Sequence, residues 1–541
     1  MYRKKLYLLF ISVLILILAA CSDEDASGEA EQSEDAIKNT NESGMPIVEE
    51  PIKLNFFAGK APATADDWND VLVYNTYEEM TGIDIEWEMV PFESLKEKRN
   101  LALASGTLPD AFHTSLFANI DILKYGNQGV FIPLNDLIEE YAPNLQKLFE
   151  EYPEVKKALT FPDGNIYSLP TIYSPDFLSL LISERPWVRE DWLTELNMEV
   201  PETTEDLYSY LKAVKENDPN GNGEADEIPF GGTSINSLLS WLKGSYGIGN
   251  RGVGHAFIDM DPEKGEVRFY PTTDEYKEML QFVNKLYEEK LIEQNIFTIE
   301  WDQYLANASE SMYGSTVFNS PEQLFAGDAG EKYMPGVALE GPYGDKLFTG
   351  ISPSVGGMGG FVITNENENP AATVRWMDYF YGDEGSKLFF MGVEGETYEE
   401  TDDGTVEYVD EITNSPDGLT LDQELAKYVT WPGGGYPGIV KEEFFKGTES
   451  SPSSLESAEI LKPYLIEEVW PKFTYTLEES DNLSVLSTDI EKYVEETRDK
   501  FITGDVPFTE WDNYVETIEN MGLEDYMEIQ KAAYGRYKGD N

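Results

Sequence analysis

The sequence predicts an α/β protein, because short apolar segments alternate with longer amphipathic ones along most of its 541 residues. Charge and cysteine content narrow the class. The chain has 102 acidic residues against 39 basic ones, a formal net charge of −63, and one cysteine. Such an acidic protein repels phosphate backbones and anionic lipid head groups, which excludes a nucleic-acid-binding body and a polybasic membrane patch. One cysteine permits no internal disulfide, cysteine-rich zinc site or iron–sulfur cluster.

The first twenty residues have the organisation of a secretory signal. Residues 3–5 are basic, and the apolar run 6–20 is shorter than the roughly 20 residues that span a bilayer as a helix. The run ends at Cys21, the only cysteine, in a sequence that resembles a bacterial lipobox. The resemblance implies that Cys21 carries a diacylglyceryl group and a further acyl chain such as palmitate, which would anchor the protein stably. An ordinary signal peptide with an incidental cysteine is the alternative.

Residues 21–50 are expected to form the lipidated cysteine and a disordered acidic tether. Residues 22–50 hold ten acids, one lysine and no aromatic residue. A segment of this composition cannot bury enough apolar surface to order itself. We therefore expect the folded body to work near the extracytoplasmic face of the membrane and to touch it only through the anchor.

Local patterns predict the main elements of the folded body. Residues 52–57 alternate as in a strand. A helix follows Pro201, because Thr203 can cap it and Asp206 stands three residues later. Residues 274–290 keep the spacing of a buried helical stripe, and a further helix is expected to end at Gly504.

The segment 217–229 combines oxygen ligands with a glycine turn, as a calcium loop does. The predicted ligands are Asp218, Asn220, Asn222, Glu224 through its carbonyl, Asp226 and Glu227. The loop departs from an EF-hand at its twelfth position, where Pro229 replaces the bidentate glutamate. We therefore expect a static structural Ca²⁺ site and not a sensor. An Asx-rich turn without an ion is the alternative.

Other motifs give little sign of catalysis. Residues 247–252 fit G-x-G-x-x-G, but they follow an apparent helix over 237–243, so no dinucleotide site is expected. There is no Walker A lysine motif and no G-x-S-x-G nucleophile elbow. His113 and His255 are expected to be structural.

Several aromatic residues stand in polar, glycine-rich contexts, where flat faces beside hydrogen-bonding groups suit sugar rings. Core packing is the alternative for each of them. The ligand-binding candidates are Trp68, Tyr167, Trp301, Trp431 and Tyr436, together with the carboxylate of Asp110.

Five segments, in this order behind the lipobox, resemble the family 1 extracellular solute-binding lipoproteins. They are 103–110, 132–137, 163–170, 189–193 and 393–398. These proteins are the substrate-binding subunits of carbohydrate ABC importers, and the chain is particularly similar to large members that bind oligosaccharides. The similarity runs from about residue 52 through nearly all of the mature chain.

The resemblance implies a two-lobed, periplasmic-binding-protein-like fold whose discontinuous α/β lobes close on a ligand by hinge motion. We expect residues 52–172 and 300–385 in lobe 1, and residues 173–299 and 386–541 in lobe 2. It also implies a structural calcium ion, and a monomer that captures a carbohydrate without chemistry and delivers it to permease subunits. A secreted polysaccharide-degrading enzyme and a sugar sensor for a receptor kinase remain open alternatives.

Overall fold

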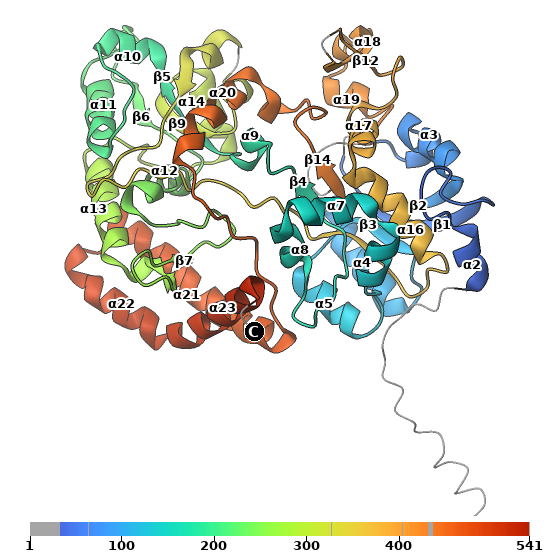
Figure 1. Cartoon of the computed structure of the whole chain (residues 1–541). Helices are drawn as coiled ribbons and strands as arrows, with labels where there is room; N and C mark the ends of the chain where they lie inside the picture. The colour runs from blue at the N-terminus through green and yellow to red at the C-terminus, as the bar shows by residue number, and fades with distance from the viewer. Residues whose placement is uncertain (1–32, 63, 326, 403, 431–435, 540–541) are drawn as a thin grey trace, which may run out of the picture.

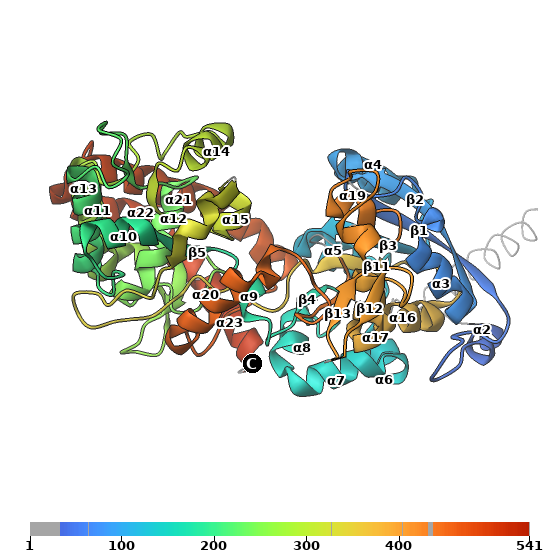
Figure 2. The same ribbon diagram turned by 90° about the horizontal axis from the view of Figure 1, so that it is seen from above.

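Two four-stranded sheets organise the chain, one in each of two lobes that lie side by side (Figures 1 and 2). The structure is a computed structural model that describes residues 33–539 except 63, 326, 403 and 431–435. The expected signal segment and Cys21 lie outside the described residues. None of the helices among the described residues combines the length with the apolar composition that a membrane span requires.

The sheet of the first lobe has the strand order β11-β3-β1-β2, with β1, β2 and β3 parallel and β11 antiparallel to β3. The predicted strand at 52–57 is confirmed as part of β1. The strands are β1 Ile52–Lys60, β2 Ile83–Pro91, β3 Ala111–Phe117 and β11 Gly359–Ile363. The helices of this lobe are α2 Glu34–Asn39, α3 Leu72–Thr81, α4 Phe92–Ser105, α5 Asn119–Asn127, α6 Asn135–Tyr141, α7 Pro143–Glu151, α8 Pro153–Leu159, α16 Pro370–Asp378, α17 Asp383–Met391, α18 Asp410–Thr413 and α19 Leu421–Leu425.

The sheet of the second lobe has the order β10-β5-β9-β6. The Thr203–Asp206 capping box is present at the start of α11, and Gly504 ends α21 in the left-handed conformation, as predicted. The strands are β5 Arg185–Arg189, β6 Ile228–Phe230, β9 Tyr313–Phe318 and β10 Tyr333–Pro335, with a hairpin of β7 Ile258–Met260 and β8 Val267–Phe269. The helices are α10 Glu190–Leu196, α11 Thr204–Glu216, α12 Ile235–Leu242, α13 Asp274–Glu288, α14 Trp301–Ser309, α15 Pro321–Leu324, α20 Pro452–Leu461, α21 Leu477–Thr503, α22 Trp511–Asn520 and α23 Leu523–Lys538.

Residues 171–184, 345–358 and 441–451, here called the crossing segments, carry the chain between the lobes (Figure 2). They contain or adjoin β4 Thr171–Tyr173, α9 Leu178–Leu181 and β14 Gly438–Val440, and β14 pairs with β4. A small apolar cluster that includes Leu181 and Phe348 holds them against α20. The lobes are therefore joined through backbone pairing and a shared apolar cluster.

The division of the chain between the lobes differs from the expected one. Residues 300–335 lie in the second lobe, because β9 pairs with β5 and β6, and β10 pairs with β5. Most of the segment 386–440 lies in the first lobe, where α17 packs into its core and is followed by the hairpin of β12 Tyr398–Glu400 and β13 Val406–Tyr408. The expected boundaries were wrong because the pairings of β9 and β10 with β5 join residues more than a hundred positions apart.

The disorder expected up to residue 50 is wrong for the described part of that segment. Ile47 and Val48 are 0% and 2% exposed and belong to the core of the first lobe. Their backbone N–H groups donate to the carbonyl of Thr81, and Arg375 donates to the carbonyl of Asn41. Two apolar side chains with these hydrogen bonds hold the segment in spite of its acidic composition.

Candidate ligand-binding cleft

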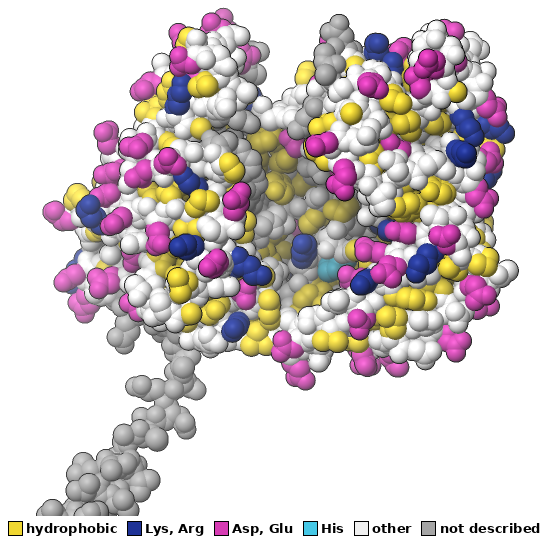
Figure 3. Space-filling view, turned by 180° about the vertical axis from the view of Figure 1, so that it is seen from behind, with side chains coloured by type: hydrophobic (Ala, Val, Ile, Leu, Met, Phe, Trp, Pro, Cys, Tyr) yellow, Lys and Arg dark blue, Asp and Glu magenta, His cyan; other side chains and the backbone are white. Residues whose placement is uncertain are grey.

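The surface is deeply hollowed between the two lobes when the molecule is seen from behind (Figure 3). At the closed end of this cleft α8 and α23 lie side by side, and the Thr474 hydroxyl donates to the carbonyl of Thr160 at 3.0 Å. The carboxyl end of strand β3 lies beside a crossing segment, because Gly359, which follows 345–358, pairs with Phe117. Ligands of open α/β sheets bind outside the carboxyl ends of parallel strands, so this end is the candidate first wall.

The backbone at the end of β3 is strained. Thr114 and Leu116 have φ of 49° and 51°, a left-handed conformation that costs roughly 1 to 3 kcal/mol for each non-glycine residue. The buried guanidinium of Arg99 holds this segment by donating to the carbonyls of Ser115 and Leu116 at 2.5 and 2.9 Å. The Leu116 side chain is 47% exposed as a result. Strain that surrounding contacts maintain, at the edge of a cleft, is typical of binding sites.

The second wall begins at Arg185, which is fully buried at the start of β5. Its guanidinium donates to the carbonyls of Ser179, Ile182 and Asn319 and to the hydroxyl of Ser454. Burial lowers the pKa of Arg185 to about 10. The side chain thus ties a crossing segment and α20 to the end of β9.

A cavity of about 250 Å³ opens in the second lobe next to the crossing segments. We call it the lobe 2 cavity. Its polar side chains come from distant parts of the chain: Glu184, Asn236, Ser240, Lys243, His255, Thr349, Glu495 and Arg498. Arg498 donates to the Asn236 side-chain oxygen at 2.8 Å. In Figure 3 a histidine and a basic side chain are visible low in the hollow between the lobes.

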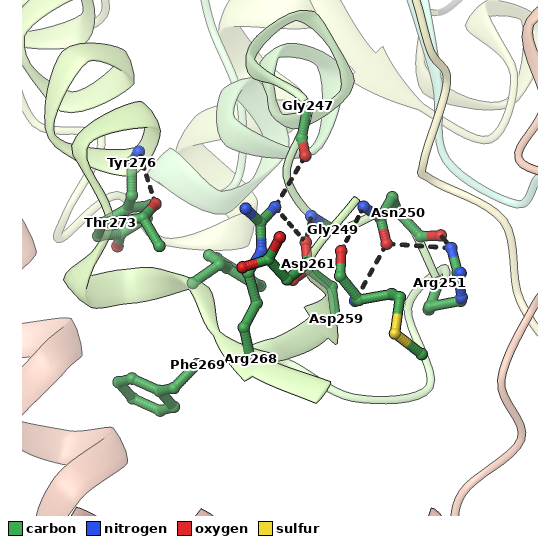
Figure 4. A network of polar contacts seen from close by, with 12 residues as sticks. Gly247, Gly249, Asn250, Arg251, Asp259, Asp261, Arg268, Phe269, Thr273 and Tyr276 are labelled. Atoms are coloured by element: carbon green, nitrogen blue, oxygen red, sulfur yellow. Dashed lines mark hydrogen bonds and ion pairs between the residues drawn. The ribbon is translucent and has the colours of Figure 1, made fainter. Parts of the chain in front are cut away.

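The turn that borders the lobe 2 cavity is fixed by a buried ion pair (Figure 4). Asp259 is 0% exposed and accepts hydrogen bonds from Arg268 and from the backbone N–H of Gly249 at 2.8 Å. Residues 247–252 follow a helix and not a strand, and their three glycines have positive φ. The glycine motif is therefore a turn clamped by Asp259 and Arg268, and this arrangement offers no dinucleotide fingerprint.

A larger cavity, of about 880 Å³, lies between α7, α17 and β14 of the first lobe. Its lining includes Lys147, Asp383 and Lys441. It does not adjoin the carboxyl end of β3 or the end of β9. Two crossing segments contribute to its lining, through residues such as Ser174 and Lys441, but no residue of β3 or β9 does, so this cavity lies away from the strand ends that form the two walls.

Two of the aromatic candidates, Trp68 and Tyr436, belong to the core of the first lobe. Trp68 is 4% exposed and is surrounded by aromatic rings, with the Trp87 ring centroid at 4.9 Å. Tyr436 is also 4% exposed and stacks on Phe389 at 3.5 Å between ring centroids. These buried rings offer a ligand little surface. Trp431 lies outside the described residues.

Tyr167 and Asp110 have structural partners. The Tyr167 hydroxyl donates to Asp163 at 2.7 Å, and its ring is buried. The Asp110 carboxylate accepts from the backbone N–H of Asn55 at 2.7 Å and so links the chain before β3 to β1. Burial raises the pKa of Asp110. Both side chains are therefore used in contacts within the first lobe.

Among the aromatic candidates that the structure describes, Trp301 is the accessible one. Its side chain is 47% exposed, and its ring lies 5.7 Å from Phe318 at the carboxyl end of β9. Phe318 pairs with Arg185, which follows a crossing segment. Trp301 is therefore placed beside the second wall of the cleft.

The two histidines have different settings. His113 is 2% exposed in the core, and burial lowers its pKa to about 3. His255 lines the lobe 2 cavity, with Nε2 3.0 Å from the carbonyl of Pro471 and its ring 4.2 Å from that of Phe473. Burial lowers the pKa of His255 to about 4, so both rings are neutral at pH 7.

The predicted calcium loop forms a tight turn after α11. Asp218 accepts from the backbone N–H groups of Asn222 and Gly223 at 3.2 and 2.9 Å. Asp226 accepts from the side-chain amides of Asn220 and Asn222 at 2.9 and 3.0 Å. The predicted side chains therefore meet at one place, and they are linked to one another by hydrogen bonds.

Glu227 completes this group with an oxygen that has no partner among the described residues. Its Oε1 is buried without a hydrogen bond, and burial raises its pKa. No three acidic, histidine or cysteine side chains of the described chain converge as a metal site. A cation at this loop would therefore also need the amide oxygens of Asn220 and Asn222, an all-oxygen set of the kind that Ca²⁺ prefers.

Two α/β lobes, a cleft at their strand ends and paired crossing segments define the architecture of a solute-binding protein. The model of the bacterial extracellular solute-binding protein family matches residues 60–387, and the chain belongs to this family. The family expected from the sequence is thus confirmed.

The chain is similar along its length to FusA, a fructooligosaccharide ABC transporter substrate-binding protein of Streptococcus pneumoniae serotype 4 (strain ATCC BAA-334 / TIGR4). The two are 30% identical over 544 residues, which cover 98% of this chain and 97% of FusA. Two solved FusA structures, one with kestose and one of an EF-hand mutant with fructo-nystose, give TM-scores of 0.70 and 0.69. Each is 28% identical and covers 91% of this chain and 100% of its own.

Proposed function

We propose that this protein captures an oligosaccharide in the cleft between its lobes and delivers it to the permease of an ABC importer. The observation that carries the proposal is the meeting of two sheet ends at the crossing segments, in a chain of the solute-binding family. The similarity to FusA over nearly the whole length supports a carbohydrate ligand. The protein acts by binding, and the ligand leaves chemically unchanged.

The crossing segments supply the means of closure. They are joined by the β4–β14 pairing and a small apolar cluster, and direct contact between the lobes includes the α8–α23 side. Rotation about these segments brings the two walls together, and a ligand held by both walls shifts the population toward the closed form. The closed form is then the one that docks on the permease.

The test is calorimetric titration with kestose, fructo-nystose and a panel of other neutral and acidic oligosaccharides. Saturable binding of at least one, with the sugar recovered intact by chromatography, is the expected result. Hydrolysis or elimination of a bound sugar would favour the secreted enzyme instead. The absence of binding across the panel would contradict the proposal.

We further propose that the loop at 218–227 holds a structural calcium ion. The donor chemistry of the loop and the unpartnered buried oxygen of Glu227 support it. The existence of an EF-hand in FusA, of which a mutant has been studied, is consistent with this assignment. Binding would exchange the hydrogen bonds within the loop for metal–oxygen bonds.

We also propose that Cys21 carries the lipid anchor, on the strength of the lipobox-like sequence. The expected location is the extracytoplasmic face of the cell membrane. Cys21→Ser should move the protein from the membrane fraction to the soluble fraction and abolish incorporation of labelled palmitate. Retention of both properties in this variant would contradict the assignment.

A further inference from the structure

We propose that the lobe 2 cavity is a subsite that holds one uncharged sugar ring of the oligosaccharide, with Lys243 as a hydrogen-bond donor to it. The inference rests on the proposed function and specifies its ligand. It is carried by the size of the cavity, by a lysine whose ammonium group has no hydrogen-bond acceptor among the described residues, and by the balance of charges around it.

Lys243 follows α12 in the short helix η2 Lys243–Tyr246, and its side chain lines the cavity. Its Nζ makes no hydrogen bond or ion pair with any described residue, and its described aromatic contact is the Tyr270 ring at 5.5 Å. Burial, and then the nearby Arg498, lower the pKa of Lys243 to about 8. The described residues give this ammonium group no hydrogen-bond acceptor, so a ligand hydroxyl in the cavity could accept from it.

The charges that face the cavity are balanced. Lys243 and Arg498 are cationic, whereas Glu184 and Glu495 are anionic. Arg498 is also paired with Asp499, with Nε 2.8 Å from Oδ1. A ligand carboxylate or phosphate would be repelled by the two glutamates, and a ligand ammonium group would be repelled by the two cations. A neutral polyol can use both signs, because each hydroxyl both donates and accepts.

The dimensions fit one ring and not a chain. A volume of about 250 Å³ lies just below the roughly 300 to 1,000 Å³ of sites for drug-sized ligands. Phe257, Tyr270 and Tyr276 contribute apolar atoms to the lining, although their rings are largely buried in the second lobe. Gly249 and Gly252 contribute backbone to the lining of the cavity.

The opening of the cavity lies at the crossing segments. Thr349 and Gly350 belong to one of these segments, and Glu184 ends another and is exposed. Val253, which also lines the cavity, is 53% exposed. A ring in the cavity would therefore leave the rest of the oligosaccharide in the cleft, where the first wall can reach it.

The deciding experiment compares Lys243→Met with Lys277→Met. Both lysines belong to the second lobe and lie about as far from an aromatic ring, 5.5 Å from Tyr270 and 5.6 Å from Trp511, but Lys277 does not line the cavity. With kestose as probe, Lys243→Met should weaken binding about tenfold or more, as expected for loss of a charged hydrogen bond. Lys277→Met should change the affinity less than twofold.

A second measurement does not depend on the folding of a variant. Mild acetylation of the wild-type protein near pH 8, followed by mass spectrometry, should modify Lys243, and saturating kestose should protect it while leaving Lys277 equally reactive. Unchanged affinity in Lys243→Met, or no protection of Lys243 by a sugar that binds, overturns the subsite and leaves the proposed function standing. Binding of acidic oligosaccharides alone also overturns it. Failure of every sugar in the panel to bind overturns both.

Discussion

Arg268 and Asp259 form a two-point ion pair beneath the turn at 247–252. Arg268 Nε lies 2.7 Å from Asp259 Oδ1, and a terminal nitrogen of the same guanidinium lies 3.1 Å from Oδ2. The carboxylate is fully buried, and burial raises its pKa in spite of the arginine. The pair also fixes Gly249, which lines the lobe 2 cavity. Both the stability of the second lobe and the shape of the proposed subsite therefore depend on this ion pair.

Asp259→Ala should destabilise the second lobe, because it leaves Arg268 without its partner. Breaking a buried pair costs about 3 to 5 kcal/mol. Asp261→Ala is the matched control in the same hairpin: it removes an ion pair with the largely exposed Lys264, which contributes less than about 1 kcal/mol, and two hydrogen bonds from backbone N–H groups of the turn. Urea unfolding, followed by tryptophan fluorescence, measures the free energy of unfolding of both variants. Equal effects of the two substitutions would contradict the role given to Asp259.

Asp378 should make stability depend on pH. It is 3% exposed and caps α7 by accepting from the backbone N–H groups of Asn144 and Leu145 at 3.1 and 2.8 Å, yet burial raises its pKa to about 6. The pKa of Asp378 in the folded protein exceeds its ordinary value of 3.8. The stabilisation that its protonated form gives the folded state is therefore complete below pH 4 and is lost as the pH rises through 6. The difference corresponds to about 3 kcal/mol at most.

Comparison with Asp378→Asn isolates this titration, because other groups titrate equally in both proteins. Between pH 4 and pH 7 the free energy of unfolding of the wild type should fall relative to that of the variant. Parallel curves over this interval would show that Asp378 keeps an ordinary pKa in the folded protein.

Calcium should raise the melting temperature of chelator-treated protein. A cation that binds only the folded state stabilises it by about 2.7 kcal/mol at a hundred times its dissociation constant. Asp218→Ala should abolish the shift, and Asp261→Ala, in a turn outside the loop, should preserve it. A wild-type protein that gives no calorimetric heat and no melting shift with Ca²⁺ would exclude the site.

Trp301→Ala should weaken kestose binding about five- to tenfold, since an aromatic contact adds roughly 0.5 to 1.5 kcal/mol beyond the area it buries. The melting temperature should change little, because the side chain is 47% exposed. Tyr343→Ala is the control. Tyr343 is an aromatic residue of the second lobe that is 67% exposed, and its hydroxyl donates a hydrogen bond to Glu278. Unchanged affinity in Trp301→Ala would remove Trp301 from the binding surface.

Local features of the fold were accessible from the sequence. The Thr203–Asp206 capping box and the left-handed Gly504 depend on residues within one turn, and both are found where they were expected. The lobe boundary was not accessible in this way. The pairing of Phe318 with Arg185 joins residues more than 130 positions apart, and no local sequence pattern predicts it.

The site was less predictable than the fold for a related reason. Trp68 and Trp301 have similar local sequence contexts, but the first is buried by distant aromatic residues and the second is exposed. Sequence reasoning missed Asn236, Lys243 and Arg498, which line one cavity although they are spread over more than 260 positions. Each stands on or next to a helix, where an isolated polar residue carries no signal of a ligand.

Small-angle X-ray scattering with and without a saturating sugar tests capture between the lobes most directly. The protein should be measured with kestose, or with whichever oligosaccharide of the panel binds most tightly, and the radius of gyration compared with that of the free protein. Closure about the crossing segments predicts a smaller radius of gyration and a more compact distance distribution at saturation. Superimposable curves for the free and saturated protein would contradict capture by closure of the cleft.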